Sequence, residues 1–477
     1  MVDHNGIFAQ SAIPQEAYVD WERFLETYGA ALPSDTPHSF YRLFGNCRFL
    51  PRFLSKYPAT FTKVVRNFNA KKEKTLSQFE QETLKLVNSS PSPLQDLKLY
   101  KYSELIRITM KDLEGGHDRA VLRELSCLAY ALLRAVTHLQ YEELKIQIGS
   151  TPLTSNGTEC LFHYLSLGKM GGYELNYSSD IDLLAITETD DGKAGNMSLH
   201  EFFVKLTQNV THALQHKDDI GFFYRVDWDL RPEGKSGTLV NNLSALEYYY
   251  ETFGAEWERQ VFTKASPGAG NLAFGEKFIK IIAPFCYRKT FDLESIRRIQ
   301  GMKEKIHDSM QSQLSKGFNV KLGIGGIRDI EFFVQAFLMV FGGVKPQIRH
   351  ISTLEIIGLL CQEKMISDQT AFDLKESYLF LRRLENKLQM LDENQTQIIP
   401  NDEDEQVKIA KRLGYLGSDA EIHEHFSSDL KRVTLTVKNI FDGLFQEKKS
   451  IESAPPFSLV ATDEFAEQIR PNLLNEM

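Results

Sequence analysis

Two short apolar runs, separated by a glycine-containing segment, form the most informative pattern in this chain. Phe162 to Leu167 is mostly apolar and Ile181 to Ile186 is almost wholly apolar. Runs of this length bounded by turn residues indicate buried strands. Gly168, Gly171 and Gly172 follow the first run directly. The pattern therefore predicts a strand, a glycine-rich turn and a second strand.

The rest of the chain alternates between helical and strand-like spacing. Apolar residues recur at helical spacing up to about residue 151, again in the amphipathic run Leu199 to His216, and over most of Leu354 to Phe445. Phe222 to Pro232 alternates apolar and charged residues, which predicts a strand. The apolar residues Val226, Trp228 and Leu230 face one side of it. The patterns predict a mostly helical protein with a small strand-containing region in the middle.

Composition narrows the class of protein. A chain of 477 residues exceeds the size of a single hydrophobic core, so we expect two or three domains. The net charge of -9 argues against binding nucleic acid through the overall field. No run reaches the length of a membrane span, and the N-terminus shows no signal-peptide pattern. The cysteines are far apart in sequence and predict buried free thiols in a reducing cytoplasm: Cys47, Cys127, Cys160, Cys286 and Cys361.

Three aspartates are the candidate catalytic and metal-binding residues. Asp180 and Asp182 open the second apolar run, and residues two apart in a strand project to the same side. Asp227 lies on the polar side of the alternating run. Carboxylate oxygens are ligands for Mg²⁺, so the set predicts metal-dependent phosphoryl or nucleotidyl transfer. The simpler alternatives are solvated aspartates at a strand end and a charged, exposed edge strand.

Several further residues are candidates for binding phosphate. Backbone groups at Gly171 and Gly172 and the hydroxyls of Ser178 and Ser179 could surround a phosphate, with Lys169 assisting.

Arg328, Glu331 and Gln335 form one polar stripe on an otherwise apolar helix that follows a glycine turn. Two interpretations remain open for this stripe. Arg328 and Glu331 pair internally, or the stripe faces a cleft with Arg328 as an anion ligand.

The order of these motifs resembles one family. The run from Gly168 to Asp182, with Glu174-Leu-Asn and Ser178-Ser-Asp-Ile-Asp, is similar to the adenylyl-removing half of the bacterial bifunctional glutamine synthetase adenylyltransferase/adenylyl-removing enzymes. The resemblance extends over roughly Phe44 to Phe445. Its other motifs are Arg225-Val-Asp to Leu230-Arg-Pro232, Trp257-Glu-Arg259, Lys321-Leu-Gly to Gln335, Leu381-Arg-Arg-Leu-Glu-Asn386 and Gln395-Thr-Gln397.

The resemblance implies a fold and a domain order. We expect an α+β, mostly α chain in which a small mixed-sheet, polymerase-β-like nucleotidyltransferase domain lies between two helical domains. The expected boundaries are residues 1–155, 156–320 and 321–446, with residues 447–477 as a linker or tail.

The resemblance also implies an activity. We expect phosphorolytic removal of AMP from a tyrosine of glutamine synthetase, giving ADP, with Mg²⁺ or alternatively Mn²⁺ held by Asp180, Asp182 and Asp227. Arg231 is a further candidate for nucleotide or phosphate binding, and Asp229 and Glu331 are candidates for supporting the site. The expected partners are glutamine synthetase, a nucleotide and inorganic phosphate, with a PII signalling protein as a further candidate.

Two other functions remain open, and three places in the sequence depart from the family pattern. The alternatives are ATP-dependent adenylylation of glutamine synthetase and a non-catalytic regulatory half that binds a PII protein. Asp229 stands where the family usually has arginine, Lys235 stands where an acidic residue is common, and Ser166-Leu167 precedes Gly-Lys where a glycine-containing pair is common. An added negative charge at Asp229 would be unfavourable for phosphate if it faced the site.

Overall fold

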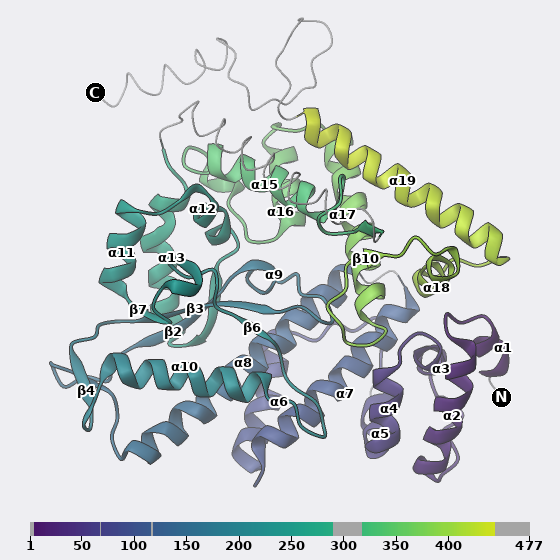
Figure 1. Ribbon diagram of the computed structural model, residues 1–477, viewed down its shortest axis with the longest axis horizontal. Helices are drawn as coiled ribbons and strands as arrows, with labels where there is room; N and C mark the ends of the chain where they lie inside the picture. The colour runs from purple at the N-terminus through teal and green to yellow at the C-terminus, as the bar shows by residue number, and fades with distance from the viewer. Residues whose placement is uncertain (1–3, 67, 116–117, 290–316, 444–477) are drawn as a thin grey trace, which may run out of the picture.

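The computed structural model describes residues 4–66, 68–115, 118–289 and 317–443 (Figure 1). Most of these residues are in helices, and the strands form small sheets. This confirms the prediction of a helix-rich chain with a small strand-containing region. The predicted tail, residues 447–477, lies outside the described residues.

In the N-terminal part, up to residue 148, the secondary-structure elements of the described residues are all helices, joined by turns and loops. Its longest helix, α8, is buried along much of its length, because apolar residues recur on several of its sides. Helix α6 begins with a capping box in which Thr75 and Gln78 exchange side-chain and backbone hydrogen bonds. The helices are α1 (His4–Ala9), α2 (Pro14–Tyr28), α3 (His38–Phe44), α4 (Phe49–Lys56), α5 (Ala59–Arg66), α6 (Leu76–Ser89), α7 (Pro93–Glu114) and α8 (Asp118–Ile148).

The middle part contains the main sheet. The two apolar runs form the strands β2 and β3, as predicted, and these pair antiparallel. The elements are β1 (Leu153–Thr154), β2 (Phe162–Ser166), α9 (Gly168–Gly171), β3 (Ile181–Thr187), β4 (Gly192–Ala194), β5 (Met197–Ser198), α10 (Leu199–Gln215), β6 (Val226–Asp227), η1 (Gly234–Ser236), β7 (Val240–Asn242), α11 (Leu243–Thr252), α12 (Glu256–Phe262), β8 (Ser266–Gly270) and α13 (Leu272–Cys286).

The sheet is mixed, and β3 lies at its centre. The strand order is β6-β3-β2-β8, and β7 also pairs with β3. Both β6 and β7 run parallel to β3, whereas β2 runs antiparallel to β3 and β8. The parallel register places Asp182 opposite Asp227. Two of the predicted metal ligands are therefore neighbours across the sheet, although 45 positions separate them in sequence.

Strand β3 is apolar from Leu183 to Ile186, where both of its faces are covered. Leu183 and Ala185 belong to the core that includes the N-terminal helices and α10. Leu184 and Ile186 belong to a separate core with residues of α11 and α13. A strand buried on both sides has no solvated face to alternate with, so its sequence reads as one continuous apolar run.

The predicted strand from Phe222 to Pro232 is mostly wrong. Only Val226–Asp227 pairs as a strand. After Asp227 the chain turns, because the Asp227 carboxylate accepts a hydrogen bond from the backbone N–H of Asp229 at 2.7 Å, and Glu233 adopts a left-handed conformation with φ of 60°. The alternation arises from single apolar side chains packing inward, as the ring of Trp228 does against Tyr164.

The C-terminal part forms a helical layer with its own core. In Figure 1 it lies beside the sheet, with α15 and α17 near the loop that carries α9. Its elements are β9 (Phe318–Asn319), α15 (Ile327–Phe341), η3 (Pro346–Ile348), α16 (Thr353–Gln362), α17 (Asp368–Gln389), β10 (Ile398–Ile399), α18 (Glu403–Leu413) and α19 (Asp419–Gly443).

Two observations bear on the predictions from composition. All five cysteines are free; four are buried, and Cys361 is partly exposed. Among the helices of the described ranges, none combines the length and apolar character that a membrane crossing requires.

Candidate active site

A cavity of about 340 Å³ lies between the sheet and the C-terminal helices. Its walls come from four regions that are distant in sequence: the ends of β3 and β6, the turn at α9, the helix α12, and the C-terminal elements around α15 and α17. The residues that line it include Gly168, Lys169, Asp180, Asp182, Asp227, Trp257, Gln260, Lys264, Lys321, Arg328, Glu331, Gln335, Gln389, Gln395 and Gln397.

The three predicted aspartates all line this cavity. Asp182 and Asp227 are paired in register on adjacent strands, and Asp180 immediately precedes β3. Gly168 packs against this group. It has a φ of 54°, and a Cβ at this position would lie 2.2 Å from Oδ2 of Asp182. A glycine is needed at residue 168 both for the left-handed backbone and for the close approach to a carboxylate.

Negative charge accumulates at this wall. Burial raises the pKa of Asp182 to about 7, with Asp227 adding to the rise; Lys321 opposes it and Asp180 contributes further. The ionised form of Asp182 is destabilised by burial and by the neighbouring carboxylates. A bound cation would offset both unfavourable contributions, so the residue fits a cation site. The oxygen donors are of the type that Mg²⁺ and Mn²⁺ prefer.

The carboxylates are not fully assembled as ligands. Within the described residues, no group of three or more His, Cys, Asp or Glu side chains is arranged to hold a metal ion. Asp180 is engaged elsewhere, since its Oδ1 accepts a hydrogen bond from Nε of Arg225 at 2.6 Å. Arg225 also donates to the backbone oxygen of Ser178 at 2.5 Å. In charge and donor type the residues fit a divalent cation, with Asp180 engaged by Arg225 in this arrangement.

Positive charge lines another part of the same cavity. Within the described residues, no hydrogen bond or ion pair engages the side chains of Lys321 or Arg328, and both are partly exposed. Of the two interpretations of the polar stripe, the structure favours the cleft, because the ion-pair partner of Glu331 is Lys264 at 2.7 Å. Two cationic side chains without an ion-pair partner among the described residues, in a cavity that also holds three aspartates, suit a ligand that carries phosphate groups.

Lys264 lies at the centre of a buried charge cluster that forms part of the cavity wall. Its ammonium contacts Glu174 at 2.8 Å as well as Glu331, and all three side chains are buried. Burial raises the pKa of Glu331, but the charges of Lys264 and Arg328 lower it by more, so its pKa lies well below the usual range. Glu331 therefore remains ionised, and its role here is to hold the helix α15 against the sheet domain.

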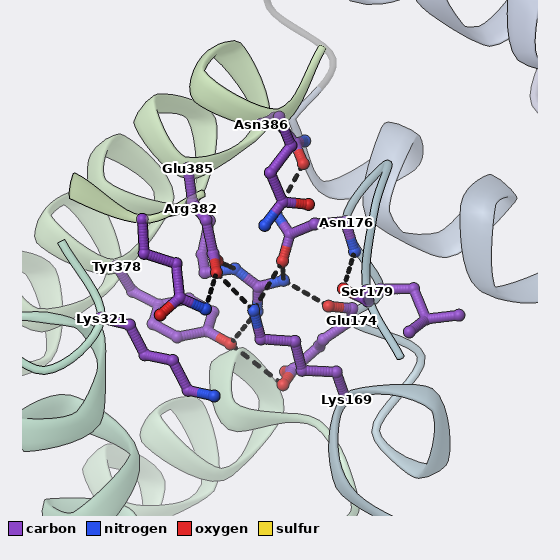
Figure 2. Close-up of polar contacts among 12 residues, drawn as sticks. Lys169, Glu174, Asn176, Ser179, Lys321, Tyr378, Arg382, Glu385 and Asn386 are labelled. Atoms are coloured by element: carbon purple, nitrogen blue, oxygen red, sulfur yellow. Dashed lines mark hydrogen bonds and ion pairs between the residues drawn. The ribbon is translucent and has the colours of Figure 1, made fainter. Parts of the chain in front are cut away.

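Lys169, predicted to assist phosphate binding, is already engaged. Its Nζ donates to Oε1 of Glu385 at 2.6 Å and to Oδ1 of Asn176 at 2.9 Å (Figure 2). Burial lowers the pKa of Lys169 to about 8, an effect that Glu385 opposes. Lys169 lines the cavity, but its charge is balanced by a carboxylate from α17.

Helix α17 holds the loop between α9 and β3 in place (Figure 2). The fully buried guanidinium of Arg382 donates to Oδ1 of Asn176 at 2.7 Å and to the backbone oxygen of Glu174. Asn386 accepts a hydrogen bond from Asn176 at 2.6 Å. The position of the aspartates thus depends on a helix about two hundred residues further along the chain.

Five of the predicted residues do not line the cavity. A Cβ on Gly171 would lie 1.7 Å from the backbone oxygen of Lys264, and one on Gly172 would lie 3.1 Å from that of Ile351. Both glycines therefore allow close packing of main chain. Ser178 is held by α17 and the residues after it, because its N–H donates to Gln389 and its hydroxyl donates to the backbone oxygen of residue 393. Ser179 does line the cavity.

The other two residues outside the cavity lie in the turn after β6. Arg231 donates hydrogen bonds to the backbone oxygens of residues 228, 235 and 237, so it stabilises that turn. Asp229 lies 3.4 Å from Lys235. Two of the positions that depart from the family pattern therefore form an ion pair with each other, and Asp229 is not among the residues that line the cavity.

Several lining residues were not predicted as site residues. Lys321, Gln260, Trp257 and the glutamines at residues 389, 395 and 397 belong to segments that lie beyond the aspartates in sequence. The usable signal was the family resemblance, which included Trp257, Lys321 and the Gln395-Thr-Gln397 motif without assigning roles to them.

Comparison with known proteins identifies the family. Residues 38–281 match the glutamate-ammonia ligase adenylyltransferase family, and residues 295–445 match the GlnD PII-uridylyltransferase family. The chain is 34% identical over 411 residues to the bifunctional glutamine synthetase adenylyltransferase/adenylyl-removing enzyme of Hahella chejuensis, covering 83% of this chain and 42% of that protein. It is 30% identical over 473 residues to the enzyme of the same description from Shewanella loihica, covering 97% of this chain and 49% of that protein.

A cavity that combines acidic and basic side chains in this way is typical of enzymes that act on phosphorylated ligands. Because residues 38–281 match its family model, the chain belongs to the glutamate-ammonia ligase adenylyltransferase family, whose members are nucleotidyltransferase enzymes. The chain spans less than half the length of the curated relatives it matches.

Proposed function

We propose that this chain removes AMP from an adenylylated tyrosine of glutamine synthetase by phosphorolysis, using a nucleotidyltransferase domain of the polymerase-β type. The observation that carries the proposal is the composition of one cavity: Asp180, Asp182 and Asp227 at the strand ends, with Lys321 and Arg328 free of ion pairs among the described residues. The names of the matching relatives include both attachment and removal of adenylyl groups. The Glu174-Leu-Asn motif resembles the removing half.

The reaction is a displacement at phosphorus. An oxygen of inorganic phosphate forms a bond to the α-phosphorus of AMP–tyrosine, the bond from that phosphorus to the tyrosine oxygen breaks, and the phenolate takes up a proton. The products are ADP and the unmodified tyrosine. A bound Mg²⁺ would neutralise the phosphoryl oxygens and the leaving phenolate, and Asp182 and Asp227, joined by Asp180 after its release from Arg225, would hold it.

The chain's own residues would bind and orient the two phosphates. Lys321 and Arg328 supply positive charge for the entering phosphate, because neither has a carboxylate partner among the described residues. Gly168 keeps space open beside Asp182. The hydrogen bonds from Arg382 and Asn386 of α17 to Asn176 hold the loop that carries Asp180. The aspartates would therefore keep one geometry relative to the substrate. The match of residues 295–445 to a PII-uridylyltransferase family makes a PII protein our candidate regulator of this chain.

A two-tube assay tests the proposal. The chain is incubated with adenylylated glutamine synthetase, Mg²⁺ and radiolabelled phosphate, and labelled ADP is measured; a parallel tube contains unmodified glutamine synthetase and labelled ATP. We expect labelled ADP in the first tube. Transfer of AMP to protein in the second tube without ADP in the first would replace the proposal by adenylylation. Inactivity in both tubes, with protein shown to be folded, would favour a regulatory half.

Replacing Lys321 by methionine should weaken the use of phosphate. Loss of a charge-assisted contact to an anion costs about 1.5–3 kcal/mol, so we expect the KM for phosphate to rise about tenfold or more. Steady-state rates at varied phosphate concentration measure this effect. Lys193, an exposed lysine on β4, supplies the matched control, and Lys193→Met should leave the KM unchanged. An unaltered KM after replacing both Lys321 and Arg328 would contradict their assignment.

A further inference from the structure

Two buried glutamine side chains in the wall of the cavity formed by α12 and α15 each have one amide atom without a hydrogen-bond partner among the described residues. Gln260 is 5% exposed and Gln335 is 6% exposed, and both line the cavity. Within the described residues, Nε2 of Gln260 and Oε1 of Gln335 have no hydrogen-bond partner. Buried polar atoms are nearly always paired, because an unpaired one loses its hydration without compensation. One donor and one acceptor in the same cavity wall therefore lack a partner, and a ligand whose polar groups met both atoms would complete them.

The orientation of the Gln335 amide is fixed by its neighbours. Its Nε2 lies 3.3 Å from the backbone oxygen of Gln260 and 3.3 Å from Oγ1 of Thr263. The hydroxyl of Thr263 donates its proton to that same backbone oxygen at 2.6 Å, so Oγ1 is free to accept. A flipped amide would place Oε1 of Gln335 against two oxygens. The amide oxygen of Gln335 is therefore the atom left open as an acceptor.

We infer that Gln335 and Gln260 recognise the adenine base of the nucleotide, an inference that rests on the proposed function of this same cavity. Adenine presents an amine donor at N6 beside ring nitrogens that accept hydrogen bonds, and a glutamine oxygen and amide N–H are the groups that pair with them. Gln335 accepts from the N6 amine, and Gln260 donates to the neighbouring ring nitrogen. A 6-oxo purine presents its oxygen and N1–H in the reverse order and would oppose both groups.

Trp257 gives the same wall a flat apolar surface. It lies one helical turn before Gln260 on α12, is 41% exposed, and lines the cavity. Aromatic side chains stack on bases irrespective of their hydrogen-bonding pattern. We therefore assign Trp257 to holding the base and the two glutamines to selecting it. The phosphates would then extend toward Lys321 and the aspartates, which line the same cavity.

Direct binding of ADP and IDP to the whole chain, measured by isothermal titration calorimetry with Mg²⁺ present, tests the inference. We expect ADP to bind at least about tenfold more tightly than IDP, the discrimination typical of a paired base edge. Gln335→Met should weaken the binding of ADP about tenfold without weakening the binding of IDP, so that the preference disappears. Gln260→Met, on a different helix, should reduce the preference in the same way. Thermal melting establishes that each variant is folded.

A glutamine of the same cavity provides the matched control. Gln395 lines the cavity but is exposed, and Gln395→Met should leave the ratio of ADP to IDP affinity as in the unaltered chain. Equal weakening of both nucleotides by Gln335→Met, or a preference for IDP in the unaltered chain, would overturn base recognition while leaving the proposed function in place. Absence of binding by either nucleotide would overturn both.

Discussion

Replacing Asp182 by asparagine is expected to lower the rate of ADP formation by about a thousandfold or more while the protein stays folded. Removing one preorganised electrostatic group from an active site typically lowers the rate by two to three orders of magnitude, and Asp182, which lines the cavity, would face both the proposed cation and the phosphates. The fold should tolerate the change, because asparagine has the same shape and the carboxylate is disfavoured by burial and by Asp227. The formation of labelled ADP measures the loss of rate, and thermal melting shows whether the variant stays folded.

The matched control for Asp182 is Asp229. It is also an aspartate of the candidate set, but it lies outside the cavity and pairs with Lys235. Asp229→Asn should change the rate by less than about twofold, as expected for a surface charge that does not meet the ligand. Mg²⁺ should raise the melting temperature of the unaltered chain and of Asp229→Asn more than that of Asp182→Asn. A near-normal rate for Asp182→Asn would exclude the metal assignment.

Replacing Lys264 by methionine is expected to lower the free energy of unfolding by about 3–5 kcal/mol. Breaking a buried ion pair leaves an uncompensated buried charge, and here two carboxylates, Glu174 and Glu331, would lose their shared cation. Urea unfolding at neutral pH measures the loss. Adding Glu331→Gln should restore part of the stability, because one of the two stranded charges is then removed.

Lys235 provides the comparison for Lys264. Its side chain is 85% exposed and contacts one carboxylate, so Lys235→Met should change the free energy of unfolding by less than about 1 kcal/mol. A loss below about 1 kcal/mol for Lys264→Met would contradict the view that this lysine joins α15 to the sheet domain.

The spacing of apolar residues was sufficient to predict secondary structure where an element is buried along one regular face or on both faces. Strands β2 and β3 and helices α2 and α10 follow from spacing alone, since each is buried along a regular face or on both faces. The pattern failed at Phe222 to Pro232. Alternation there came from individual side chains packing inward along a turn, and the backbone hydrogen bonds of the turn leave no signature in the spacing of apolar residues.

The candidate site shows the same division. The aspartates were predictable, because their spacing and their place at strand ends are properties of short segments. The engagement of Lys169 by Glu385, and the pairing of Lys264 with Glu331, were not predictable from the residues alone. Both ion pairs depend on which distant helix packs beside the loop. The sequence around a lysine does not show whether the lysine forms an ion pair in the folded protein.

The sequence by itself determined that this chain is helix-rich, that its central strands are buried, and that three aspartates lie at or next to strand ends. Only the tertiary structure decided which cations and amides face those acids. Lys321, Gln260 and Gln335 reach the cavity because α12, α15 and the residues before α15 pack beside the sheet. The reason is physical: strand and helix periodicity arise from contacts between neighbours in sequence, whereas charge pairing and open hydrogen-bonding groups are set by segments that meet only in the folded protein.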